Sequence, residues 1–305
     1  MRKIKAKGRL LGLFAGALAA GLTVEVAARV NVRRERRSRA YLGDRLYFES
    51  IGRGRPILLI PGFQGSTRYW QKSVAALGAN QQLILIDPLG FGRSPWPDID
   101  YTLEDHLGAI HRTMMSLQLT EPFLILAHSF GCLLATFYAS RYPGEVEGLV
   151  LMGAPVFRNA DDARLRVAAM SPMAAMFALH PWIASESCKV ICATRPAVQA
   201  FSRWIPSQLP PEVVSDSVLH YWKSVDGTLR NVLFGKSIES ALAGIHCPTT
   251  FIQGSDDHVT TLDRIHQAAS LCGASVRQTG DNHQSYLARS LPIILEELNR
   301  AAPQY

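Results

Sequence analysis

The sequence lacks several patterns that would point to a metal, a nucleotide or a disulfide-stabilised fold. Its five cysteines are odd in number, and they show neither a disulfide framework nor the paired spacing of a zinc site. No glycine-rich stretch has the Gly-Lys-Ser/Thr ending of a phosphate-binding loop, and the body of the chain shows no repeat. We therefore expect free thiols, no metal and no cofactor.

The body of the chain also lacks an excess of positive charge, although the whole chain carries +7. Residues 1–40 hold 11 of the 32 Lys and Arg but only two of the 25 acids. Residues 41–305 therefore carry 21 basic and 23 acidic residues, a net charge of −2. Since a nucleic-acid surface needs clustered positive charge, we expect no nucleic-acid partner.

The first forty residues combine basic and apolar character. Five basic residues precede an apolar run of 19 residues, 10–28, which only Glu25 interrupts. A membrane-crossing helix needs roughly 20 apolar residues, and an amphipathic helix on anionic lipid would also suit the basic flanks. A signal peptide cleaved near Ala19 is a third interpretation. We predict that residues 1–40 associate with membrane lipid, with export after cleavage or a cytoplasmic location as alternatives.

From residue 41 onward, short apolar runs alternate with segments that read as helices. Continuous rather than alternating apolar runs are typical of parallel strands covered on both faces. These runs lie at residues 57–60, 83–86, 123–126 and 149–152. Strands that alternate with helices in this way predict an α/β sheet.

Two features modify this simple alternation. A glycine-containing turn at residues 52–54 separates two strand-like segments, 46–49 and 55–60, and so predicts a leading hairpin. Residues 155–240 contain only helix-like segments, and strands resume near residue 249. We therefore predict an α/β core over residues 41–154 and 241–305, interrupted by a helical cap over residues 155–240.

The segment LAHSFGC, residues 126–132, places Ser129 between a predicted strand and a predicted helix. Such a serine can simply cap the helix, or it can be a nucleophile. Functional groups in an open α/β sheet gather at the carboxyl ends of the strands. An aspartate, Asp256 or Asp257, and the histidine His283 each follow a later strand, and a serine nucleophile needs a histidine base held by a carboxylate. The chain order Ser, Asp, His favours the nucleophile.

Residues 41–301 resemble the α/β-hydrolase superfamily. The motifs that carry the resemblance are LIPGF (59–63), DPLGFGRS (87–94), AHSFG (127–131), GSDD (254–257) and NH (282–283). The resemblance implies a mostly parallel, eight-stranded sheet with helices on both faces and a helical cap inserted after the sixth strand. The chain departs from the family pattern at Pro61, where histidine is usual, and at Ala127, where glycine is usual.

The resemblance also implies roles for individual residues. Ser129 would be the nucleophile, His283 the base and Asp257 the acid, since the acid of the family lies three residues after a glycine that corresponds to Gly254. The adjacent Asp256 is the alternative acid.

Further assignments concern the neighbourhood of these groups. Asp161 and Asp162 are more distant alternatives for the acid. His258 is expected to face solvent, and His128 is expected to be a pocket or packing residue rather than the base. The backbone N–H groups of Phe63 and Phe130 would form the oxyanion hole.

The serine at the elbow argues against haloalkane dehalogenases and epoxide hydrolases, because members of the superfamily with those activities carry aspartate there. We expect a serine hydrolase that acts on a carboxylic ester or related acyl compound through an acyl-enzyme. A C–C bond hydrolase, a thioesterase, a lactonase and a non-catalytic binding protein are the alternatives. The large apolar side chains of the cap would favour an apolar acyl substrate or would pack the cap. They are Met170, Met173, Met176, Phe177, Trp182, Phe201 and Trp204.

Overall fold

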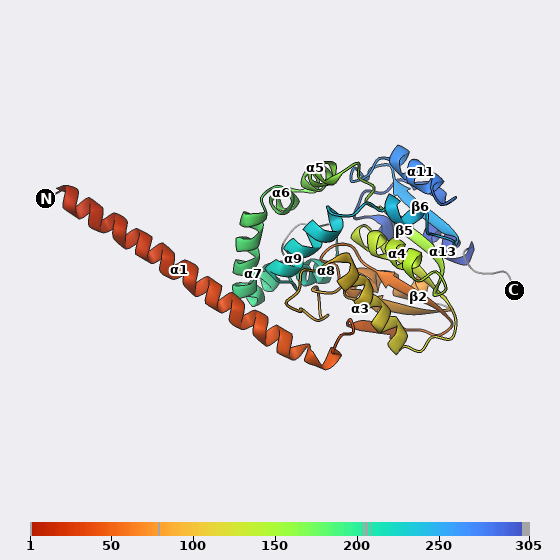
Figure 1. Ribbon diagram of the computed structural model, residues 1–305, viewed down its shortest axis with the longest axis horizontal. Helices are drawn as coiled ribbons and strands as arrows, with labels where there is room; N and C mark the ends of the chain where they lie inside the picture. Colours follow the sequence, from red (N-terminus) through yellow and green to blue (C-terminus); the bar gives the residue numbers. More distant parts are fainter. Residues whose placement is uncertain (1, 79, 203, 205–206, 208, 301–305) are drawn as a thin grey trace.

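A computed structural model describes residues 2–78, 80–202, 204, 207 and 209–300, without the side chains of residues 2–18, 72, 74–75 and 288 (Figure 1). One sheet of seven strands, in the order β1-β3-β2-β4-β5-β6-β7, forms the centre of the described chain. The strands are β1 (Phe48–Ile51), β2 (Arg55–Ile60), β3 (Gln81–Ile86), β4 (Phe123–His128), β5 (Val146–Met152), β6 (Thr249–Gly254) and β7 (Ser275–Thr279). Only β1 runs antiparallel to its neighbour.

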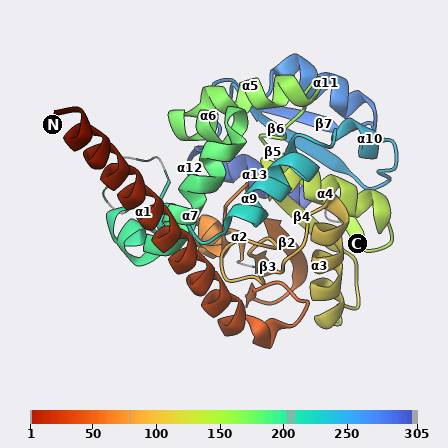
Figure 2. The same ribbon diagram turned by 60° about the vertical axis from the view of Figure 1, so that its left-hand side comes forward.

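Helices cover both faces of this sheet (Figure 2). The main-body helices are α2 (Val74–Leu77), α3 (Leu103–Ser116), α4 (Phe130–Arg141), α10 (Glu239–Leu242), α11 (Leu262–Ser270), α12 (Tyr286–Arg289) and α13 (Leu291–Arg300). Between β5 and β6 lie α5 (Ala160–Met170), α6 (Pro172–Leu179), α7 (Pro181–Ser202), α8 (Pro211–Asp216), α9 (Trp222–Thr228) and the π-helix η3 (Leu229–Leu233). The remaining helices are α1 (Arg2–Ser38) and two 3₁₀-helices, η1 (Ala40–Leu42) and η2 (Thr67–Ser73).

The sheet is buried on both faces because its central strands are apolar at every position. Leu58 and Ile60 of β2 belong to a core that includes residues of α3, α4 and α11. Ile57 and Leu59, which point the other way, belong to a second core with residues of α2 and α13. The central strands are therefore apolar at successive positions because helices cover both faces of the sheet, as the sequence predicted.

The predicted leading hairpin is wrong. β1 pairs with β3, which lies between β1 and β2 in the sheet. The turn between β1 and β2 instead passes over the start of β3. A Cβ atom at Gly52, whose φ is +82°, would lie 2.4 Å from the carbonyl oxygen of Gln81. Gly52 is therefore needed because the chain passes close to β3 at this position, and not because it forms the turn of a hairpin.

The α/β-hydrolase fold expected from the sequence is present, with two differences in detail. The described sheet has seven strands instead of the implied eight. As a result, the helical segment that we call the cap follows the fifth strand, β5, rather than the sixth. The helical segment lies between the end of β5 at residue 152 and the start of β6 at residue 249, and the predicted bounds of the cap were 155 and 240.

Helix α1 packs on the cap through its C-terminal half. Ala28 and Val32 are buried, and the side-chain amide of Asn31 donates to the carbonyl oxygen of Cys192 on α7 at 3.0 Å. Glu25 also pairs with Lys189 of α7 at 3.1 Å. These contacts tie α1 to the cap, which the predicted boundary at residue 40 did not anticipate.

Three charged side chains join the end of α1 to the cap around one tryptophan. The guanidinium groups of Arg39 and Arg195 lie 4.3 Å and 4.7 Å from the ring centroid of Trp96. Glu35 pairs with Arg39 and, at 3.2 Å, with Arg195. Burial by itself would raise the pKa of Glu35, but both arginines outweigh it and hold the pKa below its usual value.

No described helix is both long enough and apolar enough to cross a bilayer. The expected membrane-crossing helix over residues 10–28 is therefore not found among the described residues, and residues 10–18 lie outside the described side chains. Within the described part, Glu25 is charged and Ala28 is buried against protein.

We expect Glu35→Ala to lower the free energy of unfolding by about 1–2 kcal/mol, because two closely spaced arginines would lose their shared anion. Glu186→Ala is the matched control, since Glu186 forms an exposed pair with Lys189 and its loss should cost no more than about 0.5 kcal/mol. Urea unfolding of the full chain measures both values. Equal effects of the two variants would contradict the role assigned to Glu35.

Candidate active site

Ser129 lies at a sharp turn between β4 and α4. Its backbone has φ +53° and ψ −121°, a left-handed conformation that a non-glycine residue rarely adopts, and its side chain makes no capping hydrogen bond. The turn brings α4 close to β2, because a Cβ atom at Gly131 would lie 2.5 Å from the carbonyl oxygen of Ile60. Ser129 is therefore not an ordinary helix cap, and its strained backbone is a feature of functional sites.

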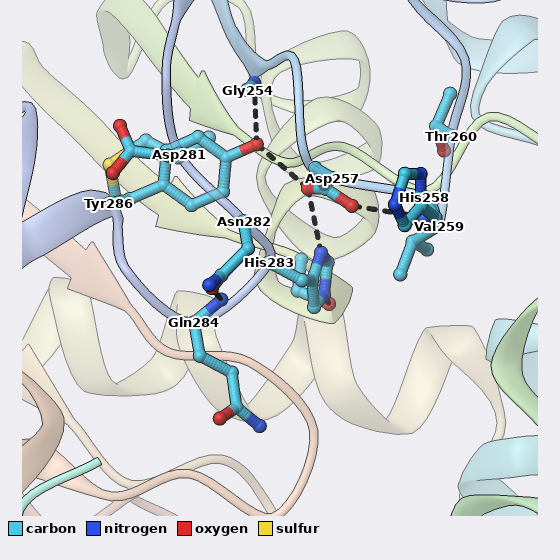
Figure 3. Close-up of polar contacts among 12 residues, drawn as sticks. Gly254, Asp257, His258, Val259, Thr260, Asp281, Asn282, His283, Gln284 and Tyr286 are labelled. Carbon is cyan, nitrogen blue, oxygen red and sulfur yellow. Dashed lines mark hydrogen bonds and ion pairs between the residues drawn. The ribbon is translucent and has the colours of Figure 1, made fainter. Parts of the chain in front are cut away.

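Ser129, His283 and Asp257 form a chain of hydrogen bonds. The Oγ atom of Ser129 lies 2.8 Å from Nε2 of His283. Nδ1 of His283 lies 2.9 Å from Oδ2 of Asp257 (Figure 3). Asp257 comes directly after β6, and His283 comes after β7. The structure thus brings together the serine, histidine and aspartate that the sequence singled out, each at the carboxyl end of a strand.

Asp257 is buried and fully engaged by donors. Its Oδ1 accepts from the backbone N–H of Val259 at 3.0 Å, and its Oδ2 accepts from the hydroxyl of Tyr286 at 2.7 Å as well as from His283 (Figure 3). Burial favours a raised pKa for Asp257, but the hydrogen bond and charge of His283, with the donors Tyr286 and Val259, lower the pKa below 3.8. Asp257 is therefore held as a carboxylate.

Tyr286 is a site residue that the sequence analysis missed. Its side chain is buried, and its hydroxyl accepts from the backbone N–H of Gly254 at 3.0 Å while it donates to Asp257. The hydroxyl thus bridges the end of β6 and the carboxylate that follows it. The sequence signal for this role is limited to the position of Tyr286, three residues after His283.

His128 supports the backbone of His283. Its Nε2 lies 2.8 Å from the carbonyl oxygen of His283, so Nε2 carries the proton, and its ring stacks on Tyr69 with 5.1 Å between centroids. Burial lowers the pKa of His128 to about 3, which keeps the ring uncharged. The prediction that His128 is a packing residue rather than the base agrees with these contacts.

Phe63 and Phe130, the predicted donors of an oxyanion hole, lie side by side. Their ring centroids are 6.0 Å apart. Phe130 is the first residue of α4, so its N–H has no partner within the helix. Phe63 follows β2 directly through Pro61 and Gly62. Their roles as donors remain a prediction, which the positions of both residues permit.

The other residues considered for the acid and the base do not belong to the chain of hydrogen bonds from Ser129 to Asp257. Asp256 and His258 are exposed, on either side of the buried Asp257. Asp161 is exposed and pairs with Arg164. Asp162 accepts from the backbone N–H of Arg158, just before α5, and pairs with Arg166. Among the described residues, neither of the two pairs with a histidine.

Most of the large cap side chains singled out from the sequence are exposed rather than buried. Five of the seven are exposed by 43% to 84%, namely Met170, Met173, Trp182, Phe201 and Trp204. Phe177 is buried and Met176 packs against the core. The five cysteines are free thiols, and no group of described residues forms a potential metal site.

Comparison with known proteins supports the fold. A family model described as "alpha/beta hydrolase fold" matches residues 55–180. The crystal structure of a bromoperoxidase from Bacillus anthracis superimposes with a TM-score of 0.66 at 18% identity, covering 84% of this chain and 94% of that one. The chain has the α/β-hydrolase fold and is similar to members of that superfamily. An esterase from Exiguobacterium antarcticum gives a TM-score of 0.64 at 18% identity, with the same coverage of both chains.

A plant protein that is named as a probable lysophospholipase is similar to this chain in sequence. The chain is 27% identical over 235 residues to probable lysophospholipase BODYGUARD 4 of Arabidopsis thaliana, which covers 73% of this chain and 56% of the relative. The chain thus spans about half the length of the plant protein. The activity of this chain is therefore a proposal.

We predict that Tyr286→Phe lowers the free energy of unfolding by about 1–3 kcal/mol at about pH 7, since a buried carboxylate loses a donor. Because Asp257 has a lowered pKa, its bonds stabilise the fold above its ordinary pKa of 3.8 and cease to do so as the pH falls through the folded value. The loss should therefore shrink as the pH falls below 3.8 and passes through the lowered pKa of Asp257.

The matched control is Tyr69→Phe, because the Tyr69 hydroxyl is buried without a partner among the described atoms. Urea unfolding at several pH values measures both variants. A loss for Tyr286→Phe that did not change with pH would contradict the bond to an ionised Asp257.

Proposed function

We propose that this α/β-hydrolase is a serine hydrolase that cleaves carboxylic esters through an acyl-enzyme. The observation that carries the proposal is the hydrogen-bonded chain from Ser129 through His283 to Asp257 at a strained strand-to-helix turn. The esterase among the similar structures and the lysophospholipase name of the plant relative are consistent with it.

The proposed reaction has two halves. Ser129 Oγ attacks the ester carbonyl carbon while Nε2 of His283 takes the hydroxyl proton, and the N–H groups of Phe63 and Phe130 bind the resulting oxyanion. His283 then protonates the alcohol, which leaves an acyl group on Ser129. In the second half, His283 takes a proton from water, hydroxide adds to the acyl carbon, and Ser129 regains its proton as the acid departs.

Asp257 gives His283 the correct tautomer for this exchange. As a buried carboxylate, it accepts the proton on Nδ1, which leaves Nε2 free to act as the base, and it stabilises the imidazolium that forms. Tyr286 fixes Asp257, and His128 holds the backbone of His283. These two residues are positioning residues in the proposal, since neither contacts Ser129 Oγ in the structure.

The substrate class is inferred from the surroundings of Ser129. Phe63, next to the turn, packs edge-on against Phe91 at 5.3 Å and against Phe130. Ser129 itself is partly accessible. Phe91 and Phe130 are buried, so Phe63, which is partly exposed, is the ring that an acyl group can contact, and it favours an apolar one. No organic cofactor or metal is needed for the chemistry. A lactone would react by the same steps.

We expect Ser129→Ala and His283→Ala to lower kcat for a p-nitrophenyl ester by about 10³-fold or more while the chain remains folded. Asp257→Asn should also lower kcat by about 10³-fold or more, because the amide cannot orient the histidine as the carboxylate does. Asp256→Asn is the matched control, and its kcat should stay within about twofold of the parent value. If Asp256→Asn lost activity and Asp257→Asn kept it, the assignment of the acid would be wrong.

A second expectation concerns acyl length. Each methylene buried against Phe63 and its apolar surroundings contributes about 0.8 kcal/mol, or roughly fourfold in kcat/KM when the burial occurs in the transition state. We expect kcat/KM to rise from acetyl to medium acyl p-nitrophenyl esters and then to fall. A profile with its maximum at acetyl would show that polar contacts, not apolar burial, select the substrate.

A further inference from the structure

The exposed large apolar side chains of this protein are concentrated on α1 and the cap. Three of them lie on α1 and nine on the cap, against three in the rest of the described chain. Soluble proteins seldom expose apolar side chains in such a cluster unless the surface meets a partner or a membrane. The cluster is the main structural feature that the proposed reaction leaves unexplained.

Part of the cluster lies on α1, α6 and α7, where α7 packs against both α1 and α6. We call this part the apolar rim. It consists of Leu22 on α1, Met173 and Leu179 on α6, and Trp182 and Ile183 on α7, with exposed fractions of 66%, 60%, 43%, 75% and 44%.

Helices α1 and α7 meet at the apolar rim. A groove of about 380 Å³ lies between them, with Ala20 and Gly21 on one wall and Trp182 and Ile183 on the other. Beyond this point, α1 continues away from the body on the side where α6 and α7 lie (Figures 1 and 2).

The sequence on either side of the apolar rim has the character of a membrane interface. Residues 10–19, which precede it on α1, include no charged residue. Beyond the rim toward the body, α1 exposes Arg33, Arg34 and Arg37. At 1.5 Å per residue, Arg33 lies roughly 17 Å along the helix from Leu22. Arginines at this spacing complement the negative charge of anionic headgroups.

We propose that the apolar rim rests in the interface of a lipid bilayer that contains anionic lipid, so that the cap faces the membrane. Tryptophan is the side chain that most favours this interface, and Trp182 is the most exposed member of the rim. The arrangement needs no membrane-crossing helix. A second copy of the chain or a soluble partner would cover the apolar side chains but would leave the arginines without a counterpart. The inference does not depend on the proposed ester hydrolysis.

The test uses the full chain, vesicles of phosphatidylcholine and phosphatidylglycerol, and lipids brominated along the acyl chain, which quench tryptophans that enter the bilayer. We expect brominated vesicles to quench part of the fluorescence, and Trp182→Phe to abolish the greater part of that quenching. The matched control is Trp204→Phe, because Trp204 is 84% exposed but lines a different groove, with Arg68 and Asp216. Trp204→Phe should retain the quenching.

A second arm tests the arginines. The combined substitution of Arg33, Arg34 and Arg37 by glutamine should weaken binding to the anionic vesicles by about tenfold or more at low salt. Binding to vesicles of phosphatidylcholine alone should change little. An equal loss on both kinds of vesicle would overturn the role of anionic lipid.

The vesicle experiment also distinguishes the proposed bilayer contact from the other possible contacts of the apolar rim. Vesicle binding without quenching of Trp182 would place the contact in residues 1–21 alone and overturn the proposal. A dimer that Trp182→Glu dissociates, together with no vesicle binding, would assign the apolar rim to self-association and also overturn it. Ester turnover in vesicle-free solution, measured on the same variants, reports separately on the proposed hydrolase activity.

Discussion

The backbone turn at Ser129 is the constraint on which the rest of the site depends. The turn ends β4 and starts α4 within one residue, which leaves Ser129 in a left-handed conformation. It is possible only because Gly131 lets α4 approach the carbonyl of Ile60, where a side chain would collide. The same turn makes Phe130 the first residue of a helix, so the serine and a free N–H lie next to each other. The packing energy of the buried sheet sustains the strain.

The loops after β6 and β7 carry the other two groups, and each is held from more than one side. Asp257 is fixed by Tyr286 and by the backbone of Val259. The loop of His283 is fixed by His128 through its carbonyl and by Asp281, whose carboxylate binds Thr279 and Ser285. Contacts from three strand ends thus converge on two side chains, and this limits the freedom of His283 to leave the serine. Such support is what precise positioning of a base requires.

The sequence predicted the residues at the strand ends because that inference needs only the order of strands along the chain. Ser129, the Asp256–Asp257 pair and His283 each follow a predicted strand, and parallel strands bring their ends together. It did not predict the place of β3 between β1 and β2, because a short turn specifies only a reversal of direction and not which strand is the neighbour. Tyr286 was missed for a similar reason, since its hydrogen bond to Asp257 exists only after β6 and β7 are side by side. The exposed cap side chains were wrongly expected in the interior because hydrophobicity alone does not reveal which face of a short helix is covered.

The most direct test of the central claim, that Ser129 is an activated nucleophile, is mass spectrometry of the chain after reaction with a fluorophosphonate. The Oγ atom of an activated serine displaces fluoride and retains the phosphonyl group, while an ordinary serine does not react. We predict a single phosphonyl adduct on the peptide that contains Ser129, its loss in His283→Ala, and its retention in Asp256→Asn. A folded, active chain that carries no adduct on Ser129, or carries it on another residue, would contradict the claim.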